Sequence, residues 1–118
     1  MTGRLTTHVL DTMAGRPAAG VPVSLFRLKD GEREAVITTL TNADGRCEAP
    51  LLEADQMTAG MYELCFHVAD YFKSCDVDLP DPPFLDVVPI RFGIGDASAH
   101  YHVPLLISPY GYSTYRGS

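Results

Sequence analysis

The sequence has no tryptophan, only three cysteines, and fewer basic than acidic residues. Nine Lys and Arg against 15 Asp and Glu give a formal net charge of -6, and the basic residues are scattered along the chain. A basic patch that could engage nucleic-acid phosphates is therefore not expected. No apolar run approaches the roughly 20 residues that a membrane-spanning helix requires. These absences argue against nucleic-acid and membrane partners.

The cysteines give no sign of a disulfide framework or a metal site. Cys47, Cys65 and Cys75 are odd in number, and their spacings match neither a zinc site nor a CxxC redox pair. Free thiols in a reducing compartment are the simplest interpretation. Residues 1–4 lead directly into a patterned segment, without the basic and apolar regions of a secretory signal. We therefore expect a cytoplasmic protein.

The length and the pattern of turns predict one all-β domain over residues 1–118. Short alternating runs separated by Gly, Pro, Asn and Asp are typical of an antiparallel, immunoglobulin-like β-sandwich. The strands are expected at 5–11, 21–28, 34–41, 46–51, 61–68, 84–94 and 99–107, with a further extended piece at 110–116. One short helix is expected around 70–74, with Asp70 capping its first turn.

Strand alternation assigns side chains to opposite faces. One face of the first strand carries Leu5, Thr7 and Val9, and the other carries Thr6, His8 and Leu10. One face of the last long strand carries Tyr101, Val103, Leu105 and Ile107, and the other carries His100, His102, Pro104 and Leu106. Since only one face can fill the sandwich core, we expect a partner subunit to cover the other apolar face.

Few residues suggest chemistry individually. His8 is a lone strand imidazole, and Arg46 follows the turn formed by residues 42–45. An arginine fork there could hold an oxyanion or a planar imide. His100 and His102 could suggest a metal site, but no Cys, Asp or Glu accompanies them at ligand spacing, so no metal is predicted.

The C-terminal residues form an unusual end for a chain. Tyr115-Arg116-Gly117-Ser118 follows closely on an apolar strand pattern, although chain ends are ordered only when something holds them. The segment brings an arginine, a hydroxyl and the terminal carboxylate together. It therefore has the composition of a polar site.

Several segments together resemble the transthyretin-related 5-hydroxyisourate hydrolases, and the resemblance covers essentially the whole chain. The segments are Leu5-Thr6-Thr7-His8-Val9-Leu10-Asp11, Asn42-Ala43-Asp44-Gly45-Arg46, His100-Tyr101-His102-Val103-Pro104-Leu105-Leu106 and the terminal tetrapeptide, which is the family's signature. The resemblance implies a transthyretin-like fold, assembled as a homotetramer with active sites in clefts at the dimer-dimer interface.

The resemblance also implies the reaction and its residues. The reaction is hydrolysis of 5-hydroxyisourate to 2-oxo-4-hydroxy-4-carboxy-5-ureidoimidazoline, the step after urate oxidation in purine degradation, and it needs no metal or organic cofactor. The implied site contains His8, Arg46, His102 and residues 115–118.

The chemistry of these side chains suggests a mechanism. A neutral imidazole, His102 or His8, would remove a proton from the attacking water, and the sequence leaves open which one. Arg46 would hold the substrate's carbonyls and stabilise charge developing on oxygen. The other histidine could orient the water or protonate the departing ring nitrogen. Ser118 would position an imidazole or the water, whereas Tyr115, Arg116 and Gly117 would contact the substrate.

Three other interpretations are weaker. A Ser-His-Asp triad is disfavoured because Ser118 has no nucleophile-elbow context. A hormone carrier of the transthyretin type would need an apolar channel and no convergent acid-base residues. A secreted immunoglobulin-like module is disfavoured by the odd number of cysteines and the missing secretory signal.

Overall fold

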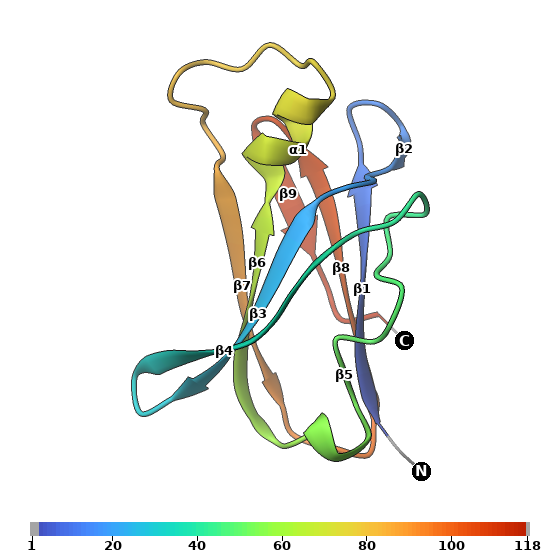
Figure 1. Cartoon of the computed structure of the whole chain (residues 1–118), viewed down its shortest axis with the longest axis vertical. Coiled ribbons are helices and arrows are strands. Elements are labelled where there is room, and N and C mark those ends of the chain that lie inside the picture. The colour runs from blue at the N-terminus through green and yellow to red at the C-terminus, as the bar shows by residue number, and fades with distance from the viewer. Residues whose placement is uncertain (1–2, 118) are drawn as a thin grey trace.

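The computed structural model describes residues 3–117 as two packed β-sheets and one short α-helix (Figure 1). One sheet has the order β2-β1-β8-β9, with β5 also paired to β1, and the other has the order β4-β3-β6-β7. The first sheet is built from β1 (Arg4–Asp11), β2 (Arg16–Pro17), β5 (Leu52–Glu53), β8 (His100–Ser108) and β9 (Gly111–Thr114). The second is built from β3 (Pro22–Lys29), β4 (Glu32–Leu40), β6 (Gly60–His67) and β7 (Val87–Ile94). The predicted all-β sandwich is confirmed.

The core lies between the sheets, and its pattern in β1 and β8 follows the predicted faces. Leu5, Val9 and Leu105 are fully buried, whereas His8 and His102 on the opposite faces are half-buried. Burying large aliphatic side chains contributes about 1.5–3 kcal/mol each, so this alternation fixes which way each strand faces. The same alternation turns the histidines outward, away from the core.

The sandwich is mostly antiparallel, as predicted, but β1 and β8 run parallel. Leu5 lies opposite Tyr101, Thr6 opposite His102 and His8 opposite Pro104. Hairpin turns specify antiparallel neighbours locally, but β1 and β8 are distant in sequence and no turn constrains their direction. The parallel register places Thr6 and His8 beside the histidines of β8.

The strand predicted at 46–51 is wrong. Arg46 makes only an isolated bridge to His8, residues 47–51 bend away, and pairing resumes in the two-residue β5. Pro50 has no N–H with which to extend a ladder, which explains the interruption. The other predicted strands lie within about three residues of the observed ones, a normal error for boundaries read from sequence.

The helix is present, but the predicted cap is wrong. α1 (Val68–Ser74) follows β6 without a loop, so Asp70 lies inside the first turn and His67 occupies the cap position without a side-chain cap hydrogen bond. The helix buries Tyr71 and Phe72, and the Tyr71 hydroxyl donates to the buried carboxylate of Asp11 at 2.7 Å. That carboxylate also accepts two backbone N–H groups of the turn after β1. Asp11 therefore ties this turn to the helix.

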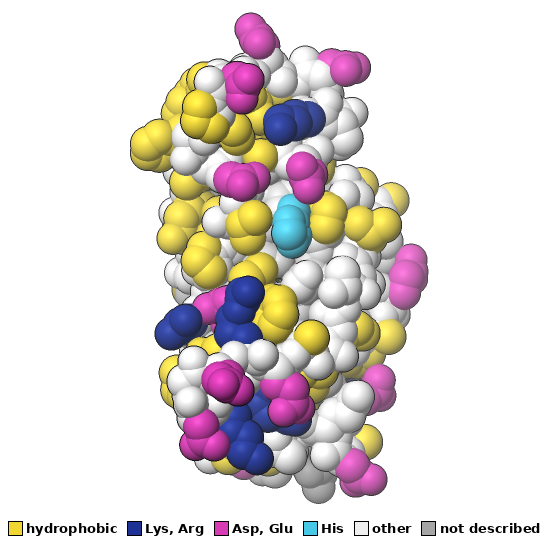
Figure 2. Space-filling view, turned by 60° about the vertical axis from the view of Figure 1, so that its left-hand side comes forward, with side chains coloured by type: hydrophobic (Ala, Val, Ile, Leu, Met, Phe, Trp, Pro, Cys, Tyr) yellow, Lys and Arg dark blue, Asp and Glu magenta, His cyan; other side chains and the backbone are white. Residues whose placement is uncertain are grey.

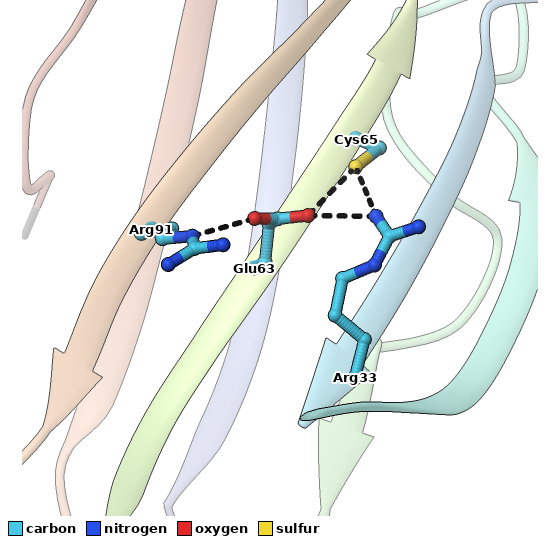
Figure 3. A network of polar contacts seen from close by, with 4 residues as sticks. All are labelled: Arg33, Glu63, Cys65 and Arg91. Carbon is cyan, nitrogen blue, oxygen red and sulfur yellow. Dashed lines mark hydrogen bonds and ion pairs between the residues drawn. The ribbon is translucent and has the colours of Figure 1, made fainter. Parts of the chain in front are cut away.

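An ionic network centred on the buried carboxylate of Glu63 lies on the outer face of the β4-β3-β6-β7 sheet (Figure 3). The Glu63 carboxylate accepts from Arg91 at 2.7 Å and from Arg33 at 2.9 Å, and these hydrogen bonds lower its pKa. Burial and the adjacent Glu63 raise the pKa of the Cys65 thiol to about 11, so the thiol is protonated and unreactive.

On the side of the molecule that carries β7 and the β3–β4 hairpin, basic and acidic side chains are intermixed on the surface (Figure 2).

Two further sequence expectations concern disulfides and membrane spans. Cys47, Cys65 and Cys75 are free thiols, as predicted. Within residues 3–117, no helix has the length and apolar character needed to cross a membrane.

Candidate active site

Three separate segments bring His8, Arg46 and His102 together on the outer face of the β1–β8 pair. β1 supplies His8, the loop before β5 supplies Arg46, and β8 supplies His102. His8 forms a backbone bridge with Arg46, and His102 forms one with Gly117. Each histidine is thus joined through the backbone to another predicted site residue.

A tight turn holds Arg46 against β1. The Asn42 side-chain oxygen accepts from the backbone N–H of Asp44 at 2.9 Å and of Arg46 at 3.2 Å. Gly45 has a φ of 75° and its carbonyl accepts from the Val9 N–H at 2.8 Å. A Cβ at Gly45 would collide with the Val9 carbonyl oxygen, so glycine is required on both counts. The turn predicted at 42–45 is confirmed, and it fixes the backbone of Arg46.

One ring nitrogen of His8 is hydrogen-bonded to this turn. Its Nε2 lies 2.9 Å from the backbone oxygen of Asp44. Because a carbonyl oxygen can only accept, Nε2 carries the hydrogen and donates it. In neutral His8, Nδ1 therefore holds the lone pair.

His102 is the second histidine that lies in one of these bridges. Burial, followed by the charges of Arg46, His100 and His8, lowers its pKa below the ordinary value of 6.5. Its Nδ1 lies 2.8 Å from the hydroxyl of Thr6. A neutral, oriented imidazole at neutral pH is the form that a general base requires.

Thr6 is a site residue that the sequence did not reveal. Its Oγ1 lies 2.8 Å from Nδ1 of His102 and 2.9 Å from Nε2 of His100. The two rings have centroids 6.3 Å apart, with the hydroxyl bonded to both. Within residues 3–117, no group of three or more His, Cys, Asp or Glu side chains is arranged to hold a metal ion.

The C-terminal segment meets this cluster through Gly117. The Gly117 N–H donates to the His102 carbonyl at 2.8 Å, and a Cβ at this position would lie 2.6 Å from Cδ2 of His102. The tail therefore packs on the imidazole edge remote from Thr6. Ser118 lies outside the described residues.

Tyr115 and Arg116 point elsewhere within the protomer. The Arg116 guanidinium lies 4.2 Å from the centroid of the Tyr101 ring, and both tail residues line a cavity of about 270 Å³ that extends to β7. Tyr115 is 62% exposed. Within one protomer these two side chains thus do not join the cluster of His8, Arg46 and His102.

A polar cavity of about 230 Å³ adjoins the cluster. Arg46 and Thr6 form part of its wall, together with Arg4, Thr7, Cys47, Glu48, Ala49 and Pro50. Two arginines and one glutamate line this cavity, so it offers a ligand both hydrogen-bond donors and a carboxylate acceptor. A small polar heterocycle is the kind of ligand that such a cavity suits.

A sequence model described as the HIUase/Transthyretin family matches residues 5–117. The chain belongs to this family. Within the family it is 61% identical over 117 residues to "5-hydroxyisourate hydrolase 2" of Rhizobium meliloti, covering 99% of this chain and 98% of the relative. It is 60% identical over 116 residues to 5-hydroxyisourate hydrolase of Ralstonia nicotianae, covering 98% and 99%.

Solved structures of family members superpose closely. A crystal structure of (S)-allantoin synthase matches with a TM-score of 0.94 and 47% identity, over 99% of this chain but only 44% of that one. Klebsiella pneumoniae 5-hydroxyisourate hydrolase matches with a TM-score of 0.81 and 39% identity, over 98% and 99%. Sea bream transthyretin in complex with thyroxine matches with a TM-score of 0.87 and 28% identity, over 97% and 94%. The transthyretin-like fold of the chain is confirmed.

Thr6 and His100 join this cluster only through the three-dimensional arrangement of the strands. Thr6 lies two residues before His8, and His100 two before His102, so strand alternation puts each on the outer face. This alternation was visible in the sequence. The parallel register that joins Thr6 to both histidines was not, because no local pattern encodes it.

Proposed function

We propose that this chain hydrolyses 5-hydroxyisourate, opening its lactam by attack of water without a cofactor, as a step of urate degradation. The observation that carries the proposal is the convergence of His8, Arg46 and His102 from three segments onto one outer face. The relatives at 60–61% identity over nearly the whole chain are named for this activity. The cluster supplies two groups for proton transfer and one fixed cation.

His102 is the general base in this proposal. Its lowered pKa leaves the imidazole neutral near pH 7, and the Thr6 contact to Nδ1 orients the ring. The opposite nitrogen, Nε2, would take a proton from water as the water oxygen bonds to the lactam carbonyl carbon. A positioned base of this kind contributes about 10²–10⁴-fold to a rate.

Arg46 stabilises the charge that water attack creates. As the carbonyl carbon becomes tetrahedral, negative charge accumulates on its oxygen, and an arginine already fixed in place does not have to reorganise. The hydrogen-bonded turn at residues 42–45 provides this fixed backbone. Removal of one such donor typically costs about 10²–10³-fold in kcat.

His8 and the tail complete the proposed site. His8 would orient the water or protonate the departing ring nitrogen. Gly117 shapes the wall beside His102, and Ser118 would position the imidazole or the water through its hydroxyl or carboxylate. Tyr115 and Arg116 would contact the substrate, and their position away from the cluster within one protomer is compatible with a role in a cleft completed by another subunit.

The proposed assembly is a homotetramer, formed as a dimer of dimers. Half-buried Leu10 and Leu106 lie on the same outer face as the histidines, and Tyr112 in the edge strand β9 is 46% exposed. Apolar groups left open on a sheet face and edge support coverage by further copies. Light scattering on the 12.9 kDa protomer tests this assembly. A cytoplasmic location and a single domain over residues 1–118 stay predictions.

Ligand carriage is the second candidate function, because the chain is similar to sea bream transthyretin in complex with thyroxine. A carrier of hydrophobic ligands needs an apolar binding surface. In this chain the part of the outer face at the candidate site carries Thr6, His8, His100 and His102 and is flanked by Arg46. The polar character of this part of the face favours the hydrolase.

The deciding experiment follows the ultraviolet absorbance of freshly generated 5-hydroxyisourate with and without purified protein. We expect decay well above the spontaneous rate, saturating with substrate. A thyroxine-displacement assay on the same sample gives the carrier its own readout. Decay at the spontaneous rate together with saturable thyroxine binding would replace the hydrolase by the carrier.

A further inference from the structure

The Thr6 hydroxyl is hydrogen-bonded to two imidazoles but has a single hydrogen to donate. Oγ1 lies 2.9 Å from Nε2 of His100 and 2.8 Å from Nδ1 of His102. A hydroxyl donates one hydrogen bond and accepts up to two, so it can donate to only one of the rings. Whenever it donates to one ring, the contact with the other requires that ring to donate.

These rules leave three arrangements for neutral His102. When Nε2 of His100 is unprotonated, Thr6 donates to His100 and accepts from Nδ1–H of His102, so Nε2 of His102 holds its lone pair. When Nε2 of His100 carries a hydrogen, in the neutral Nε2–H tautomer or in the cation, it donates to Thr6, and the hydroxyl then either donates to Nδ1 of His102 or accepts from its Nδ1–H as well. If the hydroxyl donates to Nδ1, the proton of neutral His102 sits on Nε2, which can no longer accept one.

We propose that Thr6 and His100 are positioning residues, which together determine which nitrogen of His102 carries the proton. The inference rests on the proposed function, in which Nε2 of His102 accepts the proton from water. While Nε2 of His100 carries no hydrogen, the link holds His102 in its active tautomer. Once Nε2 of His100 carries a hydrogen, the link no longer excludes the inactive tautomer of neutral His102.

The surroundings of His102 favour such a link. Gly117 packs against its Cδ2 edge, so the ring cannot turn away from Thr6 without displacing the tail. Within residues 3–117, the charged groups that act on His102 are Arg46 from the loop, His8 from β1 and His100 from its own strand. All three oppose a positive charge on His102.

The proton balance of the step is simple. Water gives one proton to Nε2 of His102 as its oxygen bonds to carbon, and His102 later gives that proton to the departing ring nitrogen. Nδ1–H remains hydrogen-bonded to Thr6 throughout. Thr6 and His100 thus hold the ring without exchanging atoms with the substrate.

Nitrogen NMR of the imidazoles tests the link without any substrate. In the native protein above the titration of both histidines, we expect His102 to be the Nδ1–H tautomer. Thr6→Val, which keeps the shape but removes the hydroxyl, should shift His102 toward the Nε2–H tautomer that free histidine prefers. Thr6→Ser should keep the native tautomer. A Thr6→Val protein whose His102 keeps the Nδ1–H form would overturn the inference.

Kinetics give the second readout. Thr6→Val should lower kcat about 10- to 100-fold, within the range of a general-base contribution, while KM changes less than about twofold, and Thr6→Ser should restore most of kcat. His100→Phe removes the group that accepts the Thr6 hydrogen, so it should also lower kcat, with little change in KM. Full kcat in His100→Phe would refute the positioning role of His100.

The two proposals fail separately. A native protein that does not hydrolyse 5-hydroxyisourate contradicts the proposed function, but the tautomer of His102 can still be measured. An active native protein with Thr6→Val at full kcat contradicts only the roles of Thr6 and His100. If Thr6→Val does not fold, the Thr6→Ser protein decides: loss of the Nδ1–H tautomer there counts against the link.

Discussion

Gly117 donates its N–H to the carbonyl of His102 at 2.8 Å while its Cα lies against the imidazole of the same residue. A Cβ at position 117 would lie 2.6 Å from Cδ2 of His102, closer than carbon atoms approach without displacement. The only residue that fits there is glycine. This contact joins the tail to the candidate active site.

We expect Gly117→Ala to displace either the tail or the His102 ring and to lower kcat about 10- to 100-fold, because small misplacements of catalytic groups are costly. Stability should change little, since the residue lies near the chain end. Gly111→Ala is the matched control: its Cβ would meet nothing closer than Ser108 Oγ at 3.7 Å. Kinetics and thermal unfolding of both variants check this. Native kcat in Gly117→Ala would contradict it.

His102→Asn should remove the base and lower kcat about 10²–10⁴-fold, with assembly unchanged. The control is His67→Asn, a half-buried histidine at the end of β6, which should keep native turnover. Stopped-flow absorbance measures kcat, and light scattering verifies the assembly. Full activity in His102→Asn would remove this residue from the mechanism and leave His8 as the base.

Replacement of Arg46 should alter both turnover and its pH dependence. Burial, then the Arg46 charge, lowers the pKa of His102, so Arg46→Met should raise that pKa and move the acidic limb of kcat to higher pH. Arg46→Lys keeps the positive charge but loses the planar set of guanidinium donors. It should therefore lower kcat/KM and leave the pH of the acidic limb unchanged. Proton NMR of His102 gives the pKa directly. If the acidic limb of kcat stays at the same pH in Arg46→Met, the Arg46 charge does not act on the pKa of His102.

Glu63→Gln should destabilise the protein by about 1–3 kcal/mol, since Arg33 and Arg91 lose a buried charged acceptor. The loss falls short of that for a fully buried pair, because the arginine side chains are 51% and 65% exposed. Glu34→Gln is the control, because its pair with Arg27 spans 3.8 Å and its side chain is 62% exposed. Urea unfolding of both variants measures the difference.

The Glu63 contribution should also depend on pH with a defined sign. Folding lowers the pKa of Glu63 from its ordinary value of 4.5. The stabilisation is therefore complete above pH 4.5 and disappears as the pH falls through the lowered pKa. Glu63→Gln should show a correspondingly smaller loss of stability over that acidic range. If the free energies of unfolding of the native protein and of Glu63→Gln fall in parallel over this pH range, the pH dependence does not come from Glu63.

Tyr71→Phe should lower the free energy of unfolding by about 1.5–3 kcal/mol, because the hydroxyl donates to the buried carboxylate of Asp11. Burial and Asp11 raise the pKa of Tyr71, so the hydroxyl remains protonated at neutral pH and is always a donor. Tyr110→Phe, at a residue that is 64% exposed, should be neutral. Equal effects of the two changes would mean that the Tyr71–Asp11 contact contributes nothing.

The sequence predicts those features that local chemistry controls. Alternation in β1 and β8 gives the inward and outward faces correctly, because a shift of one residue would expose the core side chains. The turn before Arg46 is predicted because Asn, Asp and Gly each serve a specific backbone role there. The family resemblance selected His8, Arg46 and His102, and the structure brings these three together.

The features that the sequence does not predict depend on distant partners. The parallel pairing of β1 with β8 cannot be read from either strand alone, so Thr6 is inconspicuous until His100 and His102 lie beside it. The buried Glu63 appears in the sequence as an ordinary polar position on a sheet face. Only the arrival of Arg33 from β4 and Arg91 from β7 makes it an enclosed ion.

The parallel pairing of β1 with β8 has a consequence for the order of events during synthesis. The contacts of Thr6 with His100 and His102 join residues 94 and 96 positions apart, so they can form only after most of the chain has left the ribosome. Contacts this distant in sequence are slow to form because a long loop must close first. A nascent chain that ends before β8 lacks His100 and His102 and leaves an edge of β1 unpaired, an exposed edge of the kind that chaperones protect.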